Sequence, residues 1–323
     1  MASDIIREPI EDFGLSKKGK SNALFSKIGI IGCGLVGQNL ARVASYYGLE
    51  VIFIEVSQEK IDEAFAGITR MMDHRISHWG LTESEKRANL SRIQGTTDYN
   101  LLKGCDFVIE AIRPVDRGIK IKERKEIFRR IEAVVDRNCI IATNSTTVII
   151  TELASDMEYK DRCISLHFFV SSPEARIVEV VKGLYTSEES YQKVCKFVKL
   201  INRTIVPVEE SAGLISIRLF VVALNEACEV LMEGVSSMED IDLTMRVGFG
   251  MRMGPFEVAD KIGLDKVVRW MENIYSEFGD VRYKPSPLIK KLVRAKHYGL
   301  SVGQGFYSYD EEGNRICNKP KPC

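Results

Sequence analysis

The stretch HFFVSSPEARIVEVV contains two side chains whose types and spacing could do acid–base chemistry. His167 ends an apolar run, and Glu179 follows twelve residues later between valines. An imidazole titrates near neutral pH and can take a proton from a hydroxyl group, and a carboxylate beside it fixes its tautomer. From the residues alone, His167 is interpreted equally well as a core histidine near a solvated acid. The other histidines, His74, His78 and His297, lie in charged helical stretches and are expected to be solvated.

The stretch GIIGCGLVG could bind a dinucleotide, because Gly32, Gly34 and Gly37 follow the spacing G-x-G-x-x-G between a strand and a helix. The first glycine permits a tight turn, the second lets the backbone approach a pyrophosphate, and the third allows close packing of helix and strand. The start of the helix offers its amides and the positive end of its dipole to the phosphates. Glu55 closes the next strand, where a carboxylate binds a ribose 2′-hydroxyl and repels a 2′-phosphate, so we predict NAD rather than NADP.

The hydropathy pattern predicts the elements that position these residues. From Lys27, the runs KIGIIG, LVGQNLARVASYYG and LEVIFIE form a strand, an amphipathic helix and a second strand. Further strands are expected at CDFVIEAI, CIIATNS, CISLHFF and IVEVVKG. This alternation predicts an α/β fold with a doubly wound, Rossmann-like parallel sheet. From about Gly213 the sequence contains only helical stretches, punctuated by glycine and proline, which predicts an all-α C-terminal domain.

We therefore predict three parts: a polar N-terminal extension over residues 1–26, the Rossmann-like NAD-binding domain over residues 27–207, and the helical domain over residues 208–323. The 45 basic and 45 acidic residues leave no net charge to attract nucleic acid or an anionic membrane. Eight cysteines occur singly, without CxxC or metal-ligand spacing, which favours a reducing compartment and no metal site. The charged N-terminal segment and the lack of a long apolar run indicate a cytoplasmic protein with no membrane partner.

The order of the motifs closely resembles the L-3-hydroxyacyl-CoA dehydrogenase family, which includes the 3-hydroxybutyryl-CoA dehydrogenases. The resemblance extends from Lys27 to Tyr309 and is carried by the glycine pattern, FVIEAI, ATNSTTVIITELA, HFF with VEVV, LNEACEVLMEGVSSMEDIDLTMRVGFGMRMGPFEVADKIGLD and GQGFYSY. It implies a substrate cleft between the two domains, a small-molecule acyl thioester as substrate, and a homodimer formed through the helical domain.

The resemblance also implies roles for individual residues. In the family, the histidine of HFF takes the hydroxyl proton while a hydride leaves to the nicotinamide, and the glutamate of VEV holds that histidine. These roles fall on His167 and Glu179. Thr146 stands where the family has a serine that contacts substrate or cofactor, and it keeps the hydroxyl group. The cofactor set implied by the resemblance comprises Gly32, Gly34, Leu35, Val36, Gly37, Glu55, Glu110, Asn144 and Thr146.

Some positions depart from the family pattern, and we expect them to affect the substrate more than the reaction. Ile217 replaces an asparagine of the active site, although the neighbouring Arg218 is kept. Two lysines, one of which often contacts the CoA phosphates, are absent. His78 and Trp79 stand where the family has the first of these lysines, and Ser301 stands where it has the second. Val170 and Ser171 replace an Asn-Pro pair. A short insertion, from Arg113 to Gly118, follows Glu110.

Three functional hypotheses remain open. The leading one is reversible NAD-dependent oxidation of a short-chain L-3-hydroxyacyl-CoA, such as 3-hydroxybutyryl-CoA, to the 3-oxoacyl-CoA. The second keeps the hydride chemistry but moves it to an acyl-carrier-protein thioester or a free 3-hydroxy acid, because the CoA-contacting lysines are missing. The third is a catalytically weakened NAD-binding structural relative, which Ile217 and Val170 favour and the retained His167 and Glu179 oppose.

Overall fold

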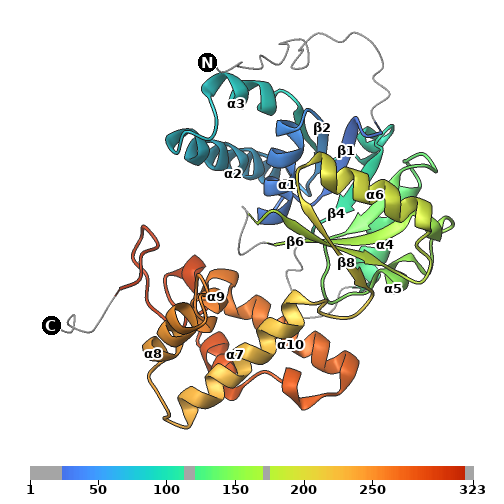
Figure 1. The fold of residues 1–323 in the computed structure, drawn as a ribbon. Coiled ribbons are helices and arrows are strands. Elements are labelled where there is room, and N and C mark those ends of the chain that lie inside the picture. The colour runs from blue at the N-terminus through green and yellow to red at the C-terminus, as the bar shows by residue number, and fades with distance from the viewer. Residues whose placement is uncertain (1–23, 113–120, 170–174, 317–323) are drawn as a thin grey trace, which may run out of the picture.

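The computed structural model describes residues 24–112, 121–169 and 175–316, which form a sheet domain followed by a helical domain (Figure 1). Most of the predicted N-terminal extension, the insertion at 113–118, and Val170 and Ser171 therefore lie outside the described residues. The strands are β1 (Lys27–Ile31), β2 (Glu50–Ile54), β3 (Ile93–Thr96), β4 (Phe107–Glu110), β5 (Ile140–Thr143), β6 (Cys163–Phe168), β7 (Ile177–Lys182) and β8 (Thr204–Glu209).

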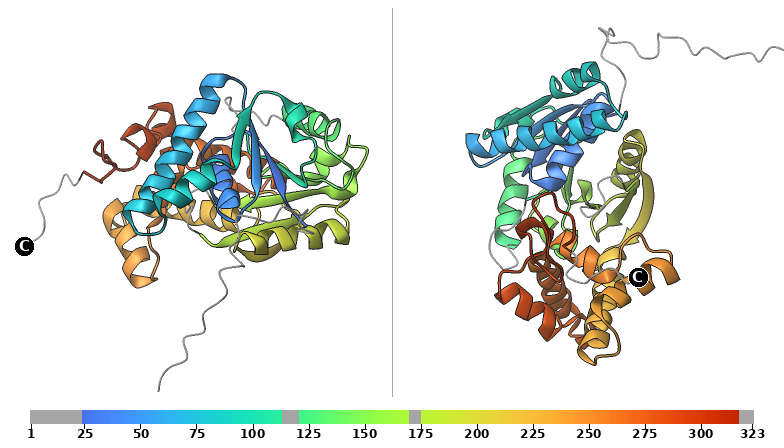
Figure 2. Two further views of the ribbon diagram at one scale, coloured as in Figure 1. Left: turned by 90° about the horizontal axis from the view of Figure 1, so that it is seen from above. Right: turned by 90° about the vertical axis from the view of Figure 1, so that its left-hand side faces the viewer.

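The helices of the sheet domain are α1 (Leu35–Tyr46), α2 (Gln58–Ser77), α3 (Glu83–Leu90), α4 (Ile121–Glu132), α5 (Ile150–Ala154) and α6 (Glu188–Leu200). The helical domain contains α7 (Ser216–Met232), α8 (Met238–Leu243), α9 (Pro255–Ile262), α10 (Leu264–Phe278) and α11 (Pro287–Arg294). Short 3₁₀ or π turns occur at Tyr99–Leu102, Lys160–Arg162, Thr244–Gly248, Val281–Tyr283 and Leu300–Val302. Figure 2 shows the two domains from two further directions.

The eight strands form one sheet in the order β3-β2-β1-β4-β5-β6-β7-β8. The first six strands of the chain are parallel and have the strand order of a Rossmann fold, so the predicted α/β fold class is confirmed. The sheet differs from the prediction at β6 and β7, which pair antiparallel. Only residues 169–176 join these two strands, and a parallel pair needs a crossover of about a dozen residues.

Two apolar cores lie on opposite faces of the sheet because successive strand residues point to opposite sides. Ile30 of β1 belongs to the core that includes Leu40 of α1 and Phe197 of α6. The next residue, Ile31, belongs to the core that includes Phe128 of α4 and Leu153 of α5. Helices therefore cover both faces of the sheet, as expected for a doubly wound domain.

The stretch LTESEKRANLSRI contains a capped helix and the first residue of an edge strand. Thr82 and Glu85 form a capping box at the start of α3, in which each side chain accepts from the other residue's backbone amide. However, the stretch does not continue as a helix, since α3 ends at Leu90 and β3 begins at Ile93. This strand is short and lies at the sheet edge, so it has little of the apolar pattern by which strands are predicted.

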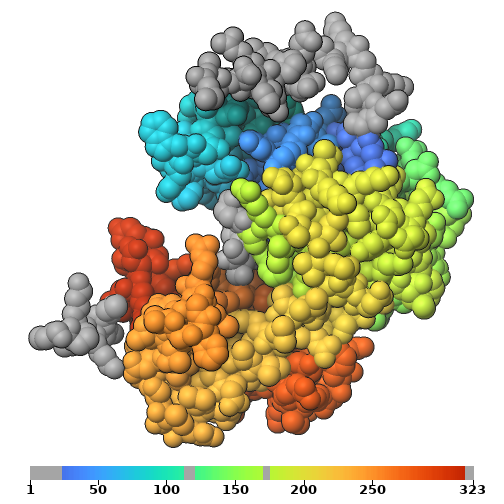
Figure 3. Space-filling model, in the orientation of Figure 1, coloured from blue at the N-terminus to red at the C-terminus, as the bar shows by residue number. Residues whose placement is uncertain are grey.

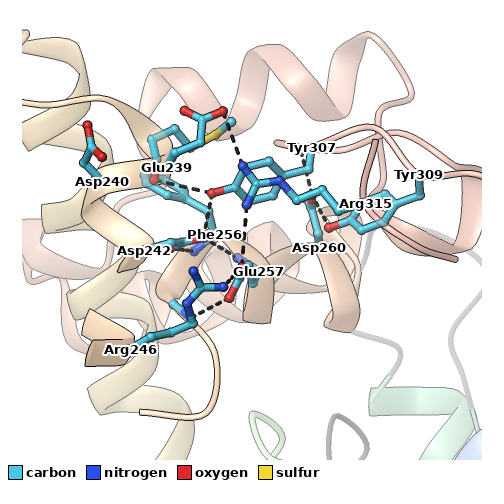
Figure 4. Close-up of polar contacts among 12 residues, drawn as sticks. Glu239, Asp240, Asp242, Arg246, Phe256, Glu257, Asp260, Tyr307, Tyr309 and Arg315 are labelled. Carbon is cyan, nitrogen blue, oxygen red and sulfur yellow. Dashed lines mark hydrogen bonds and ion pairs between the residues drawn. The ribbon is translucent and has the colours of Figure 1, made fainter. Parts of the chain in front are cut away.

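The C-terminal segment is anchored to the helical domain by the buried carboxylate of Asp260, on α9 (Figure 4). This carboxylate accepts hydrogen bonds from the amides of Phe306 and Tyr307 at 2.8 and 2.9 Å, and from the hydroxyl of Tyr309 at 3.0 Å. A Cβ at Gly305 would lie 2.0 Å from Asp260 Oδ1, so this close approach requires glycine. The motif GQGFYSY is therefore explained by packing against α9.

A second buried carboxylate, that of Asp242 on α8, connects α8, α9 and the same segment (Figure 4). It accepts from the amides of Phe256 and Glu257 at 3.0 and 3.1 Å and from the hydroxyl of Tyr307 at 2.8 Å. The guanidinium of Arg315 covers the ring of Tyr307, 3.6 Å from its centroid. Two buried carboxylates, those of Asp242 and Asp260, therefore connect α8, α9 and the C-terminal segment of the helical domain by hydrogen bonds.

Candidate active site

The glycine turn lies between β1 and α1, at the carboxyl end of the central strands. Gly32 has a φ of +86°, and a Cβ there would lie 3.0 Å from the Cα of Ile112. A Cβ at Gly37 would lie 2.4 Å from the carbonyl oxygen of Gly32, so helix and turn are in direct contact. No atom lies within 4 Å of the Cβ position of Gly34. This open face leaves the room that the second glycine of such a pattern would give a pyrophosphate to approach the backbone.

The residues beside the turn also fit a dinucleotide. Leu35 and Val36 are the first residues of α1, whose opening amides have no partner inside the helix. Glu55 directly follows β2, and its Oε1 accepts a hydrogen bond from the amide of Cys33 at 2.5 Å. Its carboxylate is therefore held beside the glycine turn, where a ribose hydroxyl of a bound dinucleotide would lie.

The antiparallel pairing of β6 with β7 places His167 directly opposite Glu179. The two side chains are 5% and 3% exposed, and His167 Nδ1 lies 2.6 Å from Glu179 Oε2. An ionised carboxylate can only accept a hydrogen bond, so Nδ1 carries the hydrogen and Nε2 keeps its lone pair in the neutral ring. Because His167 is next to the last residue of β6, the pair lies at the same edge of the sheet as the glycine turn.

Glu179 receives two more hydrogen bonds from Ser216, the first residue of α7. The Ser216 amide donates to Oε1 at 3.0 Å, and its hydroxyl donates to Oε2 at 2.9 Å. Burial raises the pKa of Glu179, but the hydrogen bonds and charge of His167 and the bonds from Ser216 outweigh burial, and the net pKa is lowered. The carboxylate is therefore stabilised in the ionised form that holds the imidazole.

Ile217 lies in the apolar core of the helical domain with Val221 and Phe256, and its side chain is 5% exposed. Position 217 was expected at the active site, but the side chain beside the buried pair is that of Ser216. Arg218 braces the same helix, since its guanidinium donates to the Tyr283 hydroxyl at 3.0 and 3.1 Å. Sequence reasoning missed Ser216 because it considered only the change at Ile217.

Glu110, at the end of β4, is fully buried and is satisfied within the sheet domain. It accepts from the Ile112 amide and the Thr143 hydroxyl, each at 2.7 Å, and forms an ion pair with Arg124 of α4. Arg124 is therefore buried, although it lies on the charged helix α4. The fixed position of Ile112 matters because this residue packs against the glycine turn.

The loop after β5 connects several parts of the site. Asn144 Oδ1 accepts from the Phe168 amide at 3.0 Å, which links this loop to the residue after His167. The carbonyl oxygen of Thr146 accepts from the Gly213 amide at 2.7 Å, in the connector that leads to α7. Asn144 and Thr146 therefore lie between the end of β6 and the start of the helical domain.

The space-filling view shows a hollow between the part of the sheet domain that carries α2 and the helical domain (Figure 3). Within the described ranges, no helix is long and apolar enough to span a membrane. In the same ranges, no three His, Cys, Asp or Glu side chains are grouped to hold a metal ion.

Models of known families match both domains. Residues 27–211 match the 3-hydroxyacyl-CoA dehydrogenase NAD-binding domain, and residues 213–309 match the 3-hydroxyacyl-CoA dehydrogenase C-terminal domain. The chain belongs to the 3-hydroxyacyl-CoA dehydrogenase family. The resemblance inferred from its motifs is thus confirmed, and the NAD-binding domain of this enzyme family implies use of NAD(H).

Individual relatives cover most of the chain. A 3-hydroxybutyryl-CoA dehydrogenase of Clostridioides difficile is 34% identical over 285 residues, covering 88% of this chain and all of the relative. The crystal structure of (S)-3-hydroxybutyryl-CoA dehydrogenase from Ralstonia eutropha has a TM-score of 0.81 and 34% identity, and the match covers 89% of this chain and 100% of that one. The structure of a diketoreductase that acts on dicarbonyl compounds has a TM-score of 0.73 and 26% identity, with 88% and 99% coverage.

The structure brings the expected residues of this dehydrogenase family into two groups on one edge of the sheet. Gly32, Gly34, Leu35, Val36, Gly37 and Glu55 surround the β1–α1 turn, and His167 and Glu179 form the buried pair, with the loop of Asn144 and Thr146 beside it. The side chain of Glu110 forms an ion pair with Arg124 and accepts a hydrogen bond from Thr143, and its role toward a cofactor stays a prediction.

Proposed function

We propose that this protein catalyses the reversible NAD-dependent oxidation of a short-chain L-3-hydroxyacyl-CoA, such as 3-hydroxybutyryl-CoA, to the 3-oxoacyl-CoA. The observation that carries the proposal is the buried His167–Glu179 pair at the strand edge that also holds the glycine turn. In parallel α/β sheets, ligands bind outside the carboxyl ends of the strands. The names of the relatives support a 3-hydroxyacyl-CoA as the substrate.

In the proposed reaction, His167 Nε2 takes the proton of the substrate 3-hydroxyl group and returns it when the 3-oxo group is reduced. NAD, when bound, supplies the hydride acceptor. Glu179 keeps the hydrogen on Nδ1, so that Nε2 is the basic atom, and its charge stabilises the imidazolium formed by proton transfer. A positioned acid–base group of this kind contributes about 10²- to 10⁴-fold to the rate.

We further propose that NAD is preferred over NADP, because the Glu55 carboxylate beside the turn would repel a 2′-phosphate. We also propose a cytoplasmic homodimer. Exposed apolar side chains on the helical domain support a protein partner there, including Val247 and Phe249, which are 75% and 73% exposed. The buried free thiols of the described cysteines are compatible with a reducing compartment.

A second candidate keeps the hydride chemistry but uses a 3-hydroxy compound without CoA, either a carrier-protein thioester or a free acid. The similarity to a diketoreductase favours this candidate, because its title describes catalysis on dicarbonyl compounds. The absence of the lysine expected beside His78 and Trp79 points in the same direction.

The experiment that separates the candidates is a comparison of NADH oxidation with acetoacetyl-CoA, the pantetheine thioester of acetoacetate, and free acetoacetate. The leading proposal predicts the highest kcat/KM for acetoacetyl-CoA. Equal kcat/KM for the CoA and pantetheine thioesters would favour a carrier-protein substrate, and turnover of free acetoacetate alone would favour the free acid. Tight NADH binding without turnover of any of the three would contradict both enzyme proposals.

A further inference from the structure

We propose that Ser216 is a positioning residue that makes the catalytic alignment of His167 depend on contact between the two domains. This inference rests on the proposed role of His167 and Glu179. Ser216 donates to both oxygens of the buried Glu179 carboxylate, through its amide at 3.0 Å and its hydroxyl at 2.9 Å.

The two bonds fix the orientation of the Glu179 carboxylate. Oε1 is held by the Ser216 amide, while Oε2 is shared between the Ser216 hydroxyl and His167 Nδ1 at 2.6 Å. Rotation of the carboxyl group would break these bonds and move Oε2 away from the imidazole. The Ser216 hydroxyl also lies 3.4 Å from Nδ1, so the three polar groups are in mutual contact.

The donor belongs to a different domain from the pair that it holds. Ser216 begins the long helix α7, whereas His167 and Glu179 lie on adjacent strands of the sheet. The positive end of α7 adds a favourable field for an ionised carboxylate. The start of a helix could serve this purpose with its amide alone, but here the side chain contributes a second bond to the oxygen that holds His167.

The connector between the domains fixes where α7 begins. Gly213 and Leu214 have φ angles of +83° and +50°, and the Gly213 amide is bonded to the Thr146 carbonyl oxygen. Farther along the helical domain, Asn273 Nδ2 donates to the Thr147 hydroxyl at 2.9 Å. A displacement of the helical domain would therefore withdraw Ser216 and release the carboxylate, so His167 is fully aligned only when the domains are seated together.

The test uses Ser216→Ala and Ser216→Thr in the full-length chain, with Ser211→Ala as the matched control. Ser211 lies in the same connector, and its hydroxyl accepts from Arg218 Nη1 at 3.3 Å without touching the pair. For Ser216→Ala we expect kcat with the best substrate to fall roughly tenfold. This is the lower limit for losing a hydrogen bond to a charged group, and it applies because the backbone amide of residue 216 still donates to Glu179. KM and NADH affinity should stay within about twofold of wild type, since Ser216 holds the carboxylate and not the ligands.

The pH profile provides a readout that a purely structural role would not change. Without the Ser216 hydroxyl, Glu179 Oε2 would accept a hydrogen bond from His167 and none from residue 216. This oxygen would then be a stronger acceptor for the hydrogen of an imidazolium. When kcat for oxidation of the hydroxyacyl substrate is plotted against pH, the fall in kcat on the acid side should therefore occur at higher pH in Ser216→Ala than in wild type. Ser216→Thr, which keeps the hydroxyl, should restore kcat and the pH of this fall to near wild type, and Ser211→Ala should match wild type.

Two results would overturn the inference while leaving the proposed function intact. In one, His167→Gln is inactive but Ser216→Ala keeps both the kcat and the pH profile of wild type. In the other, Ser216→Ala and Ser216→Thr lose activity equally with an unchanged pH profile, as expected for a local packing defect. Full activity of His167→Gln would instead refute the proposed function, and with it the role of Ser216.

Discussion

Replacing Asp260 with alanine should strongly destabilise the helical domain. Asp260 is 1% exposed and accepts from the Phe306 and Tyr307 amides and the Tyr309 hydroxyl. The substitution would leave three donors without their acceptor, the buried amide of Tyr307 and two half-buried groups, and each donor that stays shielded from water costs about 1–3 kcal/mol. Water entry and local relaxation would recover part of this cost in stability. We therefore expect the free energy of unfolding to fall by about 3–5 kcal/mol.

Urea unfolding followed by the fluorescence of Trp270 on α10 would measure this loss. A Trp79→Phe background removes the other tryptophan, which follows α2 in the sheet domain. Asp62→Ala is the control, because Asp62 is exposed and its Oδ1 accepts a surface bond from Gln58, so the change should stay within about 0.5 kcal/mol. A loss below about 1 kcal/mol for Asp260→Ala, with an unchanged m-value, would refute the anchoring role.

The same carboxyl group should give stability a characteristic pH dependence. Burial raises the pKa of Asp260, although its three donors partly oppose the shift. The folded protein therefore keeps this proton at higher pH than the unfolded chain, whose aspartates titrate near about pH 3.9. The resulting stabilisation is fully present below that value and is lost as the pH rises through the folded pKa. The free energy of unfolding of wild type relative to Asp260→Asn should therefore increase as the pH falls from 7 toward 4.

Three further predictions concern the cofactor, the core and the assembly. The kcat/KM of wild type should be at least roughly tenfold higher with NADH than with NADPH, which corresponds to about 1.4 kcal/mol, and Glu55→Ala should reduce this ratio. Equal kcat/KM values of wild type with both cofactors would contradict the role of Glu55. Ile217→Asn should lower the free energy of unfolding by about 2–4 kcal/mol, because it buries an amide in an apolar core, whereas unchanged stability in urea would place the side chain elsewhere. Light scattering should show a dimer that Phe249→Asp shifts toward monomer, and a monomeric wild type at micromolar concentration would argue against the assembly.

The elements with strong local patterns were predictable from the sequence. The glycine turn, the position of Glu55 after β2 and the parallel pairing of β1 to β6 appear as predicted, because a glycine pattern between a strand and a helix has few structural solutions. The pairing of His167 with Glu179 was proposed from family resemblance, and the geometry gives its cause in the antiparallel register of β6 and β7. The short connection between those strands could have predicted this register.

Other features depend on contacts between distant parts of the chain and could not be predicted from local patterns. The side chain of Ser216 faces Glu179, and that of Ile217 faces the core, because of how α7 docks on the sheet domain. Nothing local in the sequence fixes this helix rotation. Similarly, Asp260 and the residues that bind it are separated by more than 40 positions, so the buried carboxylate appeared only as one polar residue in a helical stretch.

The central claim is that His167 transfers the substrate proton while Glu179 orients it. The most direct test is kcat for the His167→Gln variant with the best of the three acetoacetyl substrates, measured beside NADH affinity by fluorescence titration. We predict a fall in kcat of roughly 10²- to 10⁴-fold with NADH affinity within about twofold of wild type, because the imidazole moves the proton and does not hold the dinucleotide. Wild-type turnover by His167→Gln would contradict the account.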